Sequence, residues 1–491
     1  MKKRVMVDMS ATLIHHGHIR LLKKASKYGD VIVGLTTDEE IKKKKGYDPE
    51  LSFDERKEIL ESIKYVKEVV PTPWLIDEAV LEKYNIDLLV HGHDNSNQVS
   101  EDKLIIFPRT EGISSTILRE RVMKAYAQKK SQNILLTPGP ATTTYSVKLA
   151  QIVDDICPRE KEFGDVMKWI SQELTSIVAD NKKYTTVLFG GSGTAAVESI
   201  LTSVIPEDKK VLIINNGAYG ERMCQISNRY GINFSEFKSS PIQPIDFNKL
   251  EEVIKKEENL SHLAVVHNET TTGLLNDLNK IGELAEKYNL DLIVDAMSSY
   301  GAIPIDMEKQ NIKYLAASSN KNLQGMAGVS FVIAKKEALE KLKNVKPKSF
   351  YLSLYEQYNF FEKHNQTRFT PPVQTMYALK QAIVELKEEG VENRYKRYSK
   401  SWETLTQGLK KLGLQYVVDD KHHSKIITSI LLPENLDFDD LHDYFYEKGF
   451  TIYPGKVKDL NTFRIANIGD IDYRDIERFL ELFAEYLNHK D

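Results

Sequence analysis

The sequence has few cysteines, no long apolar run and almost no excess of charge. Its 491 residues include two cysteines, Cys157 and Cys224, which lack the spacing of metal ligands or of a disulfide framework. We therefore expect neither a zinc finger nor a disulfide-stabilised extracellular fold. No stretch approaches the roughly 20 apolar residues that cross a bilayer. A net charge of −4 gives no indication of a nucleic-acid or anionic-membrane partner.

What remains is the composition of an enzyme with more than one domain. Hydrophobic residues make up 41% and charged residues 28% of the chain. The first residues, Met1-Lys2-Lys3-Arg4, run straight into a short strand pattern and not into a long apolar signal segment. The chain is too long for one ordinary hydrophobic core, so two or three domains are expected. We predict a cytoplasmic protein.

The first 125 residues alternate short apolar runs with amphipathic segments. Helical spacing of apolar residues occurs at 19–28, 53–63 and 75–84, and Ser52 with Glu55 matches the capping-box pattern before the second of these. Strands are expected between them, at residues 5–7, 31–35, 66–70, 88–91 and 104–107. This alternation predicts an α/β fold of Rossmann-like type, with a parallel sheet and helices on both faces.

A polar segment at residues 124–133 separates this part from the rest. Thr137-Pro138-Gly139-Pro140 then opens a second α/β alternation, which ends in an α+β portion. Its expected strands are residues 186–189, 211–214, 263–266, 290–294 and 329–333. We predict a first domain at 1–130 and a second at 131–491, with a large part at about 150–385 and a small part at about 390–491.

Two motifs in the first domain have the chemistry of a nucleotidyl-transfer site. His15 and His18 lie three residues apart at an expected helix start, so both imidazoles project from the first turn, at the positive end of the helix dipole. Arg109 precedes a second expected helix start with hydroxyl side chains, where it can bind phosphate oxygens. A His pair can also simply cap a helix. The two motifs together on one β/α frame favour phosphate chemistry.

With His15-His16-Gly17-His18 and Arg109-Thr110-Glu111-Gly112-Ile113-Ser114-Ser115-Thr116, residues 1–125 resemble the cytidylyltransferase family, most closely its glycerol-3-phosphate and phosphoethanolamine types. The resemblance implies that an acceptor phosphate or phosphonate oxygen attacks the α-phosphorus of CTP and expels pyrophosphate, with Mg²⁺ shielding the charge. It implies catalysis by His15 and His18 and acceptor contacts for Lys45 and Arg56. It also implies nucleotide contacts for Ser10, His15, His18, Asp94, Arg109, Gly112, Ile113, Ser114, Ser115 and Thr116.

Some of these positions have alternatives or depart from the family pattern. Lys45 could instead belong to a solvated run of lysines, and Arg56 could be an arginine on a helix surface. Related transferases carry Gly-Thr-Phe-Asp where this chain has Met9-Ser10-Ala11-Thr12, so Thr12 replaces a carboxylate. We therefore expect an acceptor that differs from that of the common members. His91 and His93 are expected to be structural and not metal ligands.

The second domain contains the four elements of a pyridoxal-phosphate (PLP) site. A PLP enzyme needs a Schiff-base lysine, a carboxylate beside the pyridine nitrogen, a cradle for the phosphate and a ring on the pyridine face. Lys321, Asp295, the Gly191–Thr194 segment and Tyr219 match these four. Each alone is weak, since Gly-Ser-Gly can be any turn and Tyr219 any core ring. Their order and spacing together predict a PLP site.

From Leu135 onward the chain resembles class V, fold-type I aminotransferases, and among them the 2-aminoethylphosphonate–pyruvate transaminase type. The matching segments include Asn215–Gly220, His267–Gly273, Val294–Ser299 and Phe369–Pro372. The resemblance implies Lys321 as the proton-transfer base and Arg464 as the clamp for the substrate carboxylate and phosphonate. It implies PLP contacts for Ser192, Gly193, Thr194, Tyr219, Thr270, Asp295, Asn320 and Lys321, and, across a homodimer interface, for Thr367 and Thr370.

The two resemblances imply consecutive reactions. The transaminase would make 2-aminoethylphosphonate from phosphonoacetaldehyde and alanine, releasing pyruvate, and the first domain would convert it with CTP to CMP-2-aminoethylphosphonate. One alternative joins a phosphocholine or phosphoethanolamine cytidylyltransferase to an alanine–glyoxylate type transaminase. Another makes the first domain a CTP-binding regulatory module without turnover, although His15, His18 and Arg109 are all present. The expected partners are these small molecules and a second copy of the chain, with PLP and Mg²⁺ as cofactors.

Overall fold

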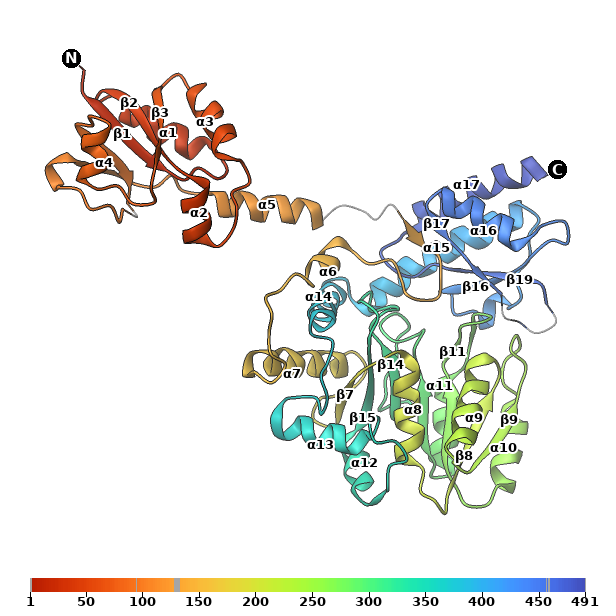
Figure 1. The fold of residues 1–491 in the computed structure, drawn as a ribbon. Coiled ribbons are helices and arrows are strands. Elements are labelled where there is room, and N and C mark those ends of the chain that lie inside the picture. Colours follow the sequence, from red (N-terminus) through yellow and green to blue (C-terminus); the bar gives the residue numbers. More distant parts are fainter. Residues whose placement is uncertain (1, 94, 128–132, 456, 458–459, 491) are drawn as a thin grey trace. The chain divides into compact units, whose positions relative to one another are not determined.

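A computed structural model gives the structure of residues 2–93, 95–127, 133–455, 457 and 460–490 (Figure 1). The chain divides into two compact units, Met1–Tyr126 and Ala127–Asp491. Within the described ranges, no helix combines the length and the apolar character needed to cross a membrane.

Unit 1 is built on a five-stranded parallel sheet with the order β3-β2-β1-β4-β5. Successive side chains of β1 point to opposite faces, so Val5 and Val7 enter one core while Met6 enters the other. The parallel α/β sheet predicted for this part is confirmed. Its strands are β1 Arg4–Met9, β2 Asp30–Thr36, β3 Val66–Thr72, β4 Leu88–Gly92 and β5 Leu104–Phe107.

Helices follow the strands of unit 1, and the Ser52–Glu55 capping box forms as expected. One helix was not indicated by the sequence, because its lysine-rich turn buries a single side chain, Ile41, and has no apolar periodicity. The helices are α1 His16–Ala25, α2 Asp38–Lys45, α3 Phe53–Glu61, α4 Glu78–Lys83 and α5 Ser115–Ala127.

The strand order fixes where unit 1 can bind a ligand. β1 and β4 are neighbours in the sheet, although β2 and β3 lie between them in the chain. The connections therefore leave β1 and β4 in opposite directions, which opens a crevice at their carboxyl ends. α1, with the predicted histidine pair at its start, follows β1 directly.

Unit 2 contains a seven-stranded sheet with the order β7-β15-β14-β13-β10-β8-β9, in which β15 runs antiparallel to both neighbours. Two of its strands, β9 and β14, were not expected. β9 lies at the edge of the sheet and has a polar sequence, Phe-Ser-Glu-Phe-Lys. The strands are β7 Tyr184–Gly190, β8 Lys210–Asn215, β9 Phe234–Lys238, β10 Leu260–Val266, β13 Asp291–Asp295, β14 Ile312–Ser318 and β15 Val329–Lys335, with the hairpin β11 Asn268–Glu269 and β12 Leu274–Leu275.

Two separate cores cover the two faces of this sheet. Leu188 of β7 packs into one core with α7, α10, α11 and α14, whereas Val187 and Phe189 pack into the other with α8 and α9. The result is a three-layer α/β/α arrangement. These helices are α6 Tyr145–Leu149, α7 Lys161–Ser176, α8 Gly193–Val204, α9 Ala218–Arg229, α10 Phe247–Lys256, α11 Leu278–Lys287, α12 Lys336–Lys341, α13 Leu354–His364 and α14 Val373–Glu389.

A smaller α/β part completes unit 2. Its core joins Ile134 and Leu136 to side chains after residue 400, and β6 pairs with β17. The first described residues of unit 2 therefore belong with its last ones. The elements are β6 Ile134–Leu135, β16 Ile427–Leu431, β17 Phe450–Thr451, β18 Tyr453–Pro454 and β19 Thr462–Ala466, with α15 Val391–Lys411, α16 Phe438–Glu447 and α17 Tyr473–Lys490.

Candidate active sites

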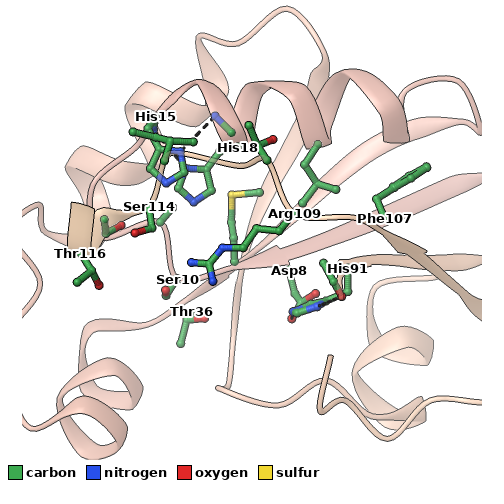
Figure 2. Close-up of a pocket in the computed structure, with 18 of the residues that line it drawn as sticks. Asp8, Ser10, His15, His18, Thr36, His91, Phe107, Arg109, Ser114 and Thr116 are labelled. Atoms are coloured by element: carbon green, nitrogen blue, oxygen red, sulfur yellow. Dashed lines mark hydrogen bonds and ion pairs between the residues drawn. The ribbon is translucent and has the colours of Figure 1, made fainter. Parts of the chain in front are cut away.

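A cavity of about 610 Å³ lies at the carboxyl ends of β1 and β4 in unit 1. Figure 2 shows residues of both predicted motifs around it, with the Arg109 side chain extended between the histidine pair and the side chains of Asp8 and His91. The predicted residues that line the cavity are Ser10, His15, His18, Lys45, Arg109, Ile113, Ser114, Ser115 and Thr116. The structure thus brings together motifs that lie about 90 residues apart in the chain.

The histidine pair both caps α1 and faces the cavity. His15 is the N-cap residue: its Nδ1 accepts from Gly17 N at 3.2 Å, and His18 Nδ1 accepts from His15 N at 3.2 Å. The two rings are stacked, with centroids 3.9 Å apart. Because Nδ1 is an acceptor in each ring, a neutral imidazole must carry its proton on Nε2. Capping therefore fixes the tautomer that offers an N–H donor.

Burial keeps both rings neutral. It lowers the pKa of His18 to about 3, with a smaller contribution from His15. Burial also lowers the pKa of His15, assisted by the positive charge of His16 and Arg109. At neutral pH the pair thus offers hydrogen bonds and not full positive charge. The cationic groups of the cavity must come from its arginine and lysine side chains.

The second motif supplies a helix start and a guanidinium. Ser114 Oγ accepts from Ile117 N at 3.1 Å, which caps the first turn of α5. Gly112 has φ +73°, a conformation that favours glycine, and makes the turn into this helix without lining the cavity. The Arg109 guanidinium has no hydrogen-bond partner in the described part of the chain. A free guanidinium beside a helix N-terminus suits a polyphosphate.

The two residues expected to contact the acceptor differ in position. Lys45 Nζ reaches into the cavity, 3.3 Å from Ser10 Oγ and 5.3 Å from the centre of the Trp74 ring. Arg56 is completely buried and does not line the cavity. Its guanidinium donates to Ser10 O, Thr36 O at 3.0 Å and Asp38. Arg56 is therefore not on the helix surface, and in this structure it holds backbone segments behind the cavity wall. Asp94 lies outside the described residues.

Several lining residues were not predicted from the sequence. Tyr47 and Trp74 come from loops, Phe107 from the end of β5 and Arg119 from the second turn of α5, and their spacing in the sequence does not mark them as site residues. Asp8 lies 3.4 Å from His91 Nε2 and accepts from Asn97 Nδ2 at 3.0 Å. Among the described residues, no three His, Cys, Asp or Glu side chains are grouped so that they could hold a metal ion.

In unit 2, a cavity of about 380 Å³ lies between the start of α8 and the ends of β13 and β14. Backbone N–H groups at the start of α8 lie at one end of it, an arrangement that suits an anion. A Cβ at Gly193 would lie 2.5 Å from Met297 Sδ, so a larger residue would require the Met297 side chain to shift. The predicted residues that line it are Ser192, Gly193, Thr194, Tyr219, Asp295, Asn320 and Lys321. This combination fits PLP.

The carboxylate of this cavity is buried and its lysine is half-buried. Burial lowers the pKa of Lys321 to about 8, partly opposed by Asp295. Burial raises the pKa of Asp295, which is opposed by the hydrogen bond from Met297 N at 2.9 Å. A neutral amine is thus accessible near neutral pH, and the carboxyl is placed for a cationic ring nitrogen.

Two unpredicted charged groups accompany Tyr219. Arg222 lies one helical turn further along α9, with its Cζ 4.8 Å from the centre of the Tyr219 ring and Nη1 3.3 Å from Thr194 Oγ1. This i, i+3 spacing could have been noticed in the sequence. Glu269 is fully buried, and burial raises the pKa of its carboxyl, against the hydrogen bonds from Thr271. No sequence pattern distinguished Glu269.

The other predicted residues of unit 2 do not line this cavity. Thr270 Oγ1 is 2.8 Å from Ser298 Oγ, and Arg464 Nη1 donates to Thr270 O at 3.4 Å. Burial lowers the pKa of Arg464. Thr367 and Thr370 line a different, shallow hollow, which lies beside β7. Within the described chain they do not complete the phosphate cradle.

Two family models match the chain. Residues 141–457 match Aminotransferase class-V, and residues 11–121 match Cytidylyltransferase-like. The first match covers more than half of the chain. It agrees with the PLP cavity of unit 2, whereas the second coincides with the strands and helices around the cavity of unit 1.

Relatives and solved structures match unit 2. A bifunctional phosphonoacetaldehyde hydrolase/aminoethylphosphonate transaminase of Clostridioides difficile is 42% identical over 376 residues, which are 76% of this chain and 59% of that protein. A 2-aminoethylphosphonate–pyruvate transaminase of Bacillus cytotoxicus is 40% identical over 361 residues, 73% of this chain and 98% of the relative.

A similar solved structure is alanine–glyoxylate aminotransferase from Nostoc sp., with a TM-score of 0.69, 24% identity, and coverage of 73% of this chain and 96% of that one. At this identity the likeness concerns the fold alone, and it confirms a fold-type I transferase for unit 2. Together with the family match and the 40% identical relative, these findings confirm PLP as the expected cofactor. The chain belongs to the class V aminotransferase family and carries, before its aminotransferase unit, a cytidylyltransferase-like domain.

Proposed function

We propose that this chain makes 2-aminoethylphosphonate and then activates it. Unit 2 transfers the amino group of alanine to phosphonoacetaldehyde, giving 2-aminoethylphosphonate and pyruvate. Unit 1 transfers the cytidylyl group of CTP to that product, giving CMP-2-aminoethylphosphonate and pyrophosphate. The observation that carries the proposal is the presence, in one chain, of a cavity lined by His15, His18 and Arg109 and a second cavity lined by Lys321 and Asp295.

The substrates of unit 2 are inferred from its relatives and supported by its charges. Two relatives that match over most of unit 2 have names that specify aminoethylphosphonate transaminase. Arg464, held by Thr270 O and by Pro454 O at 3.0 Å, offers a guanidinium for a carboxylate or a phosphonate. Lys321 and the buried Asp295 provide the other groups that a transaminase requires.

The residues of unit 2 divide the work of transamination. Bound PLP supplies an electron sink for the substrate's Cα electrons. The start of α8 and Ser192 would hold its phosphate, Asp295 would keep its ring nitrogen protonated, and Tyr219 would pack on its ring. Lys321 Nζ, with its lowered pKa, would accept the proton that leaves the substrate carbon and hold it for return.

Unit 1 works by positioning and by electrostatic stabilisation. A phosphonate oxygen forms a bond to the α-phosphorus of CTP while the bond from that phosphorus to the β-phosphate oxygen breaks, and pyrophosphate leaves with the bonding electrons. The Nε2–H groups of His15 and His18 donate to the oxygens that gain charge. Arg109 and the first turn of α5 hold the triphosphate.

In this proposal Mg²⁺ binds together with CTP. Because the described residues contain no group of three metal-ligating side chains, an ion would be held chiefly by triphosphate oxygens and water, as is common for Mg²⁺. The protein residues named above act on the phosphates directly.

An acceptor panel tests the proposal. Full-length protein is incubated with CTP, Mg²⁺ and either 2-aminoethylphosphonate, phosphoethanolamine, phosphocholine or glycerol 3-phosphate, without a keto acid, and pyrophosphate is measured. We expect the highest kcat/KM with 2-aminoethylphosphonate. Preference for a phosphate ester would support the alternative pairing of substrates, and CTP binding without any pyrophosphate would support a regulatory module.

A homodimer in the cytoplasm is part of the same proposal. Thr367 and Thr370 lie away from the cavity of their own chain, and Thr370 is exposed. Both would reach the cofactor phosphate of a second copy. Dilution should therefore release PLP in step with dissociation, as measured by sedimentation and cofactor absorbance. A fully loaded, active monomer would contradict this.

A further inference from the structure

We propose that Arg119 binds the phosphonate of the acceptor in unit 1, and that Thr12 is the residue that allows it to do so. This inference rests on the proposed cytidylyl transfer and names a specificity residue for it. Arg119 lies on the second turn of α5 and lines the cavity together with Lys45. The nucleotide motif ends before it, at Thr116.

The contacts of Arg119 fix the direction of its guanidinium. Glu50 pairs with the edge formed by Nε and Nη2, and its Oε2 lies 2.7 Å from Nη2. Nη2 also donates to Thr12 Oγ1 at 3.2 Å, and the Tyr47 ring lies 5.1 Å from Cζ. Because Glu50 takes one edge of the planar fork, Nη1 lies on the opposite edge. The side chain is thus held in place before any ligand arrives, which makes Glu50 a positioning residue.

This region offers positive charge for the acceptor, whereas the cavity-lining Arg20 and Lys24 belong to α1, and Lys24 lies over the Phe107 ring. Arg56 is fully engaged behind the cavity wall by Ser10 O, Thr36 O and Asp38. Lys45 and Arg119 are the cations on the side of the cavity that contains Tyr47 and Trp74. A phosphonate dianion placed between them would receive charge-assisted hydrogen bonds from both.

Thr12 sets the charge around that guanidinium. Its side chain is 1% exposed, and its hydroxyl accepts a hydrogen bond from Arg119 without adding a charge. A carboxylate at this position would be buried against the guanidinium and would pair with it. Arg119 would then face two acids, Glu50 and the carboxylate, and a dianionic acceptor would be repelled. The neutral hydroxyl leaves the guanidinium available.

The test separates acceptor binding from nucleotide binding. KM values for 2-aminoethylphosphonate and for CTP are measured by pyrophosphate release, in the full-length holoenzyme without a keto acid. Arg119→Met should raise the KM of the acceptor by roughly 10- to 100-fold, the usual effect of losing a hydrogen bond to a charged group, and change that of CTP little. Arg119→Lys should restore part of the loss, and Thr12→Asp should raise the acceptor KM in the same way.

Two controls complete the design. Lys124→Met removes one positive charge from an exposed position on the same helix and should leave both KM values unchanged. Thr12→Val removes the hydroxyl without adding charge and should have a much smaller effect than Thr12→Asp. An Arg119→Met variant that raises the CTP KM, or changes neither KM, overturns the inference. If the wild-type enzyme prefers phosphoethanolamine, the proposed substrate is wrong, but the same test applies with that acceptor because Arg119 contacts the phosphorus group.

Discussion

The two cavities solve the problem of binding anionic substrates in opposite ways. In unit 2 the reactive groups are buried or half-buried, and loss of contact with water is the main cause of the altered pKa values of Lys321, Asp295, Glu269 and Arg464. In unit 1 the cavity is larger, its histidines are neutral, and its cations are arginine and lysine side chains. A site that performs proton transfer needs shifted pKa values, whereas a site that transfers a nucleotidyl group needs positioned donors.

The comparison predicts that each site can be disabled alone. Lys321→Ala should reduce transamination by about 10³-fold or more, because the proton-transfer base is lost. CTP-dependent pyrophosphate release from added 2-aminoethylphosphonate should remain close to wild type, since Lys321 belongs to unit 2. Both rates are measured on one preparation, together with PLP absorbance. Loss of both activities in a folded variant would contradict the independence of the two sites.

The reciprocal change concerns the histidine pair. His18→Ala should lower kcat for cytidylyl transfer by about 10²-fold, the scale for a donor aimed at developing charge. CTP binding, measured by equilibrium titration, should weaken much less, since Arg109 and the start of α5 remain. Transamination serves as the internal control. A cytidylyl-transfer rate near that of the wild type would show that the histidine pair only caps the helix and does not act in catalysis.

The pH dependence of the two sites should also differ. The amine of Lys321 is neutral above its pKa of about 8, so capture of PLP by the apoenzyme should accelerate with rising pH and level off above 8. Below that value we expect roughly tenfold slowing per pH unit. With a pKa of about 3, His18 stays neutral throughout this range. Stopped-flow absorbance between pH 6 and 9 tests the first expectation, and a pH profile of His18→Ala that differs from wild type would contradict the second.

A small and local effect is expected at the capping box of α3. Ser52 accepts from Glu55 N and Glu55 reaches back to Ser52 N, so Ser52→Ala should lower the stability of unit 1 by about 1 kcal/mol. Hydrogen exchange should detect this in α3 and not in unit 2. Ser62 lies at the other end of the helix, and its hydroxyl donates to Glu58 O. Ser62→Ala is therefore the matched control. An equal change in unit 2 would show that the units are coupled.

Sequence patterns predicted the strands and helices around both sites better than the side chains that line the cavities. Apolar runs identified most of the strands, although they missed β14 in the interior of the unit 2 sheet, and paired motifs led to the cavities at the strand ends. Edge strand β9 was missed because alternating polar residues resemble a loop. The role of Arg56 depends on three acceptors from distant segments, which no local pattern reveals. Arg119 and Glu269 were missed for the same reason: tertiary contacts, and not spacing, place them at a site.

The pairing of β6 with β17 has a consequence for biosynthesis. Leu136 N donates to Thr451 O, and Ala466 N donates to Leu136 O. Residues near the start of unit 2 therefore form these hydrogen bonds only with residues about 315–330 positions further along the chain. The sheet of unit 1, in contrast, draws all its strands from residues before 108. On the ribosome, unit 1 can therefore fold while unit 2 is still being synthesised, and the small part of unit 2 closes only when translation is nearly complete.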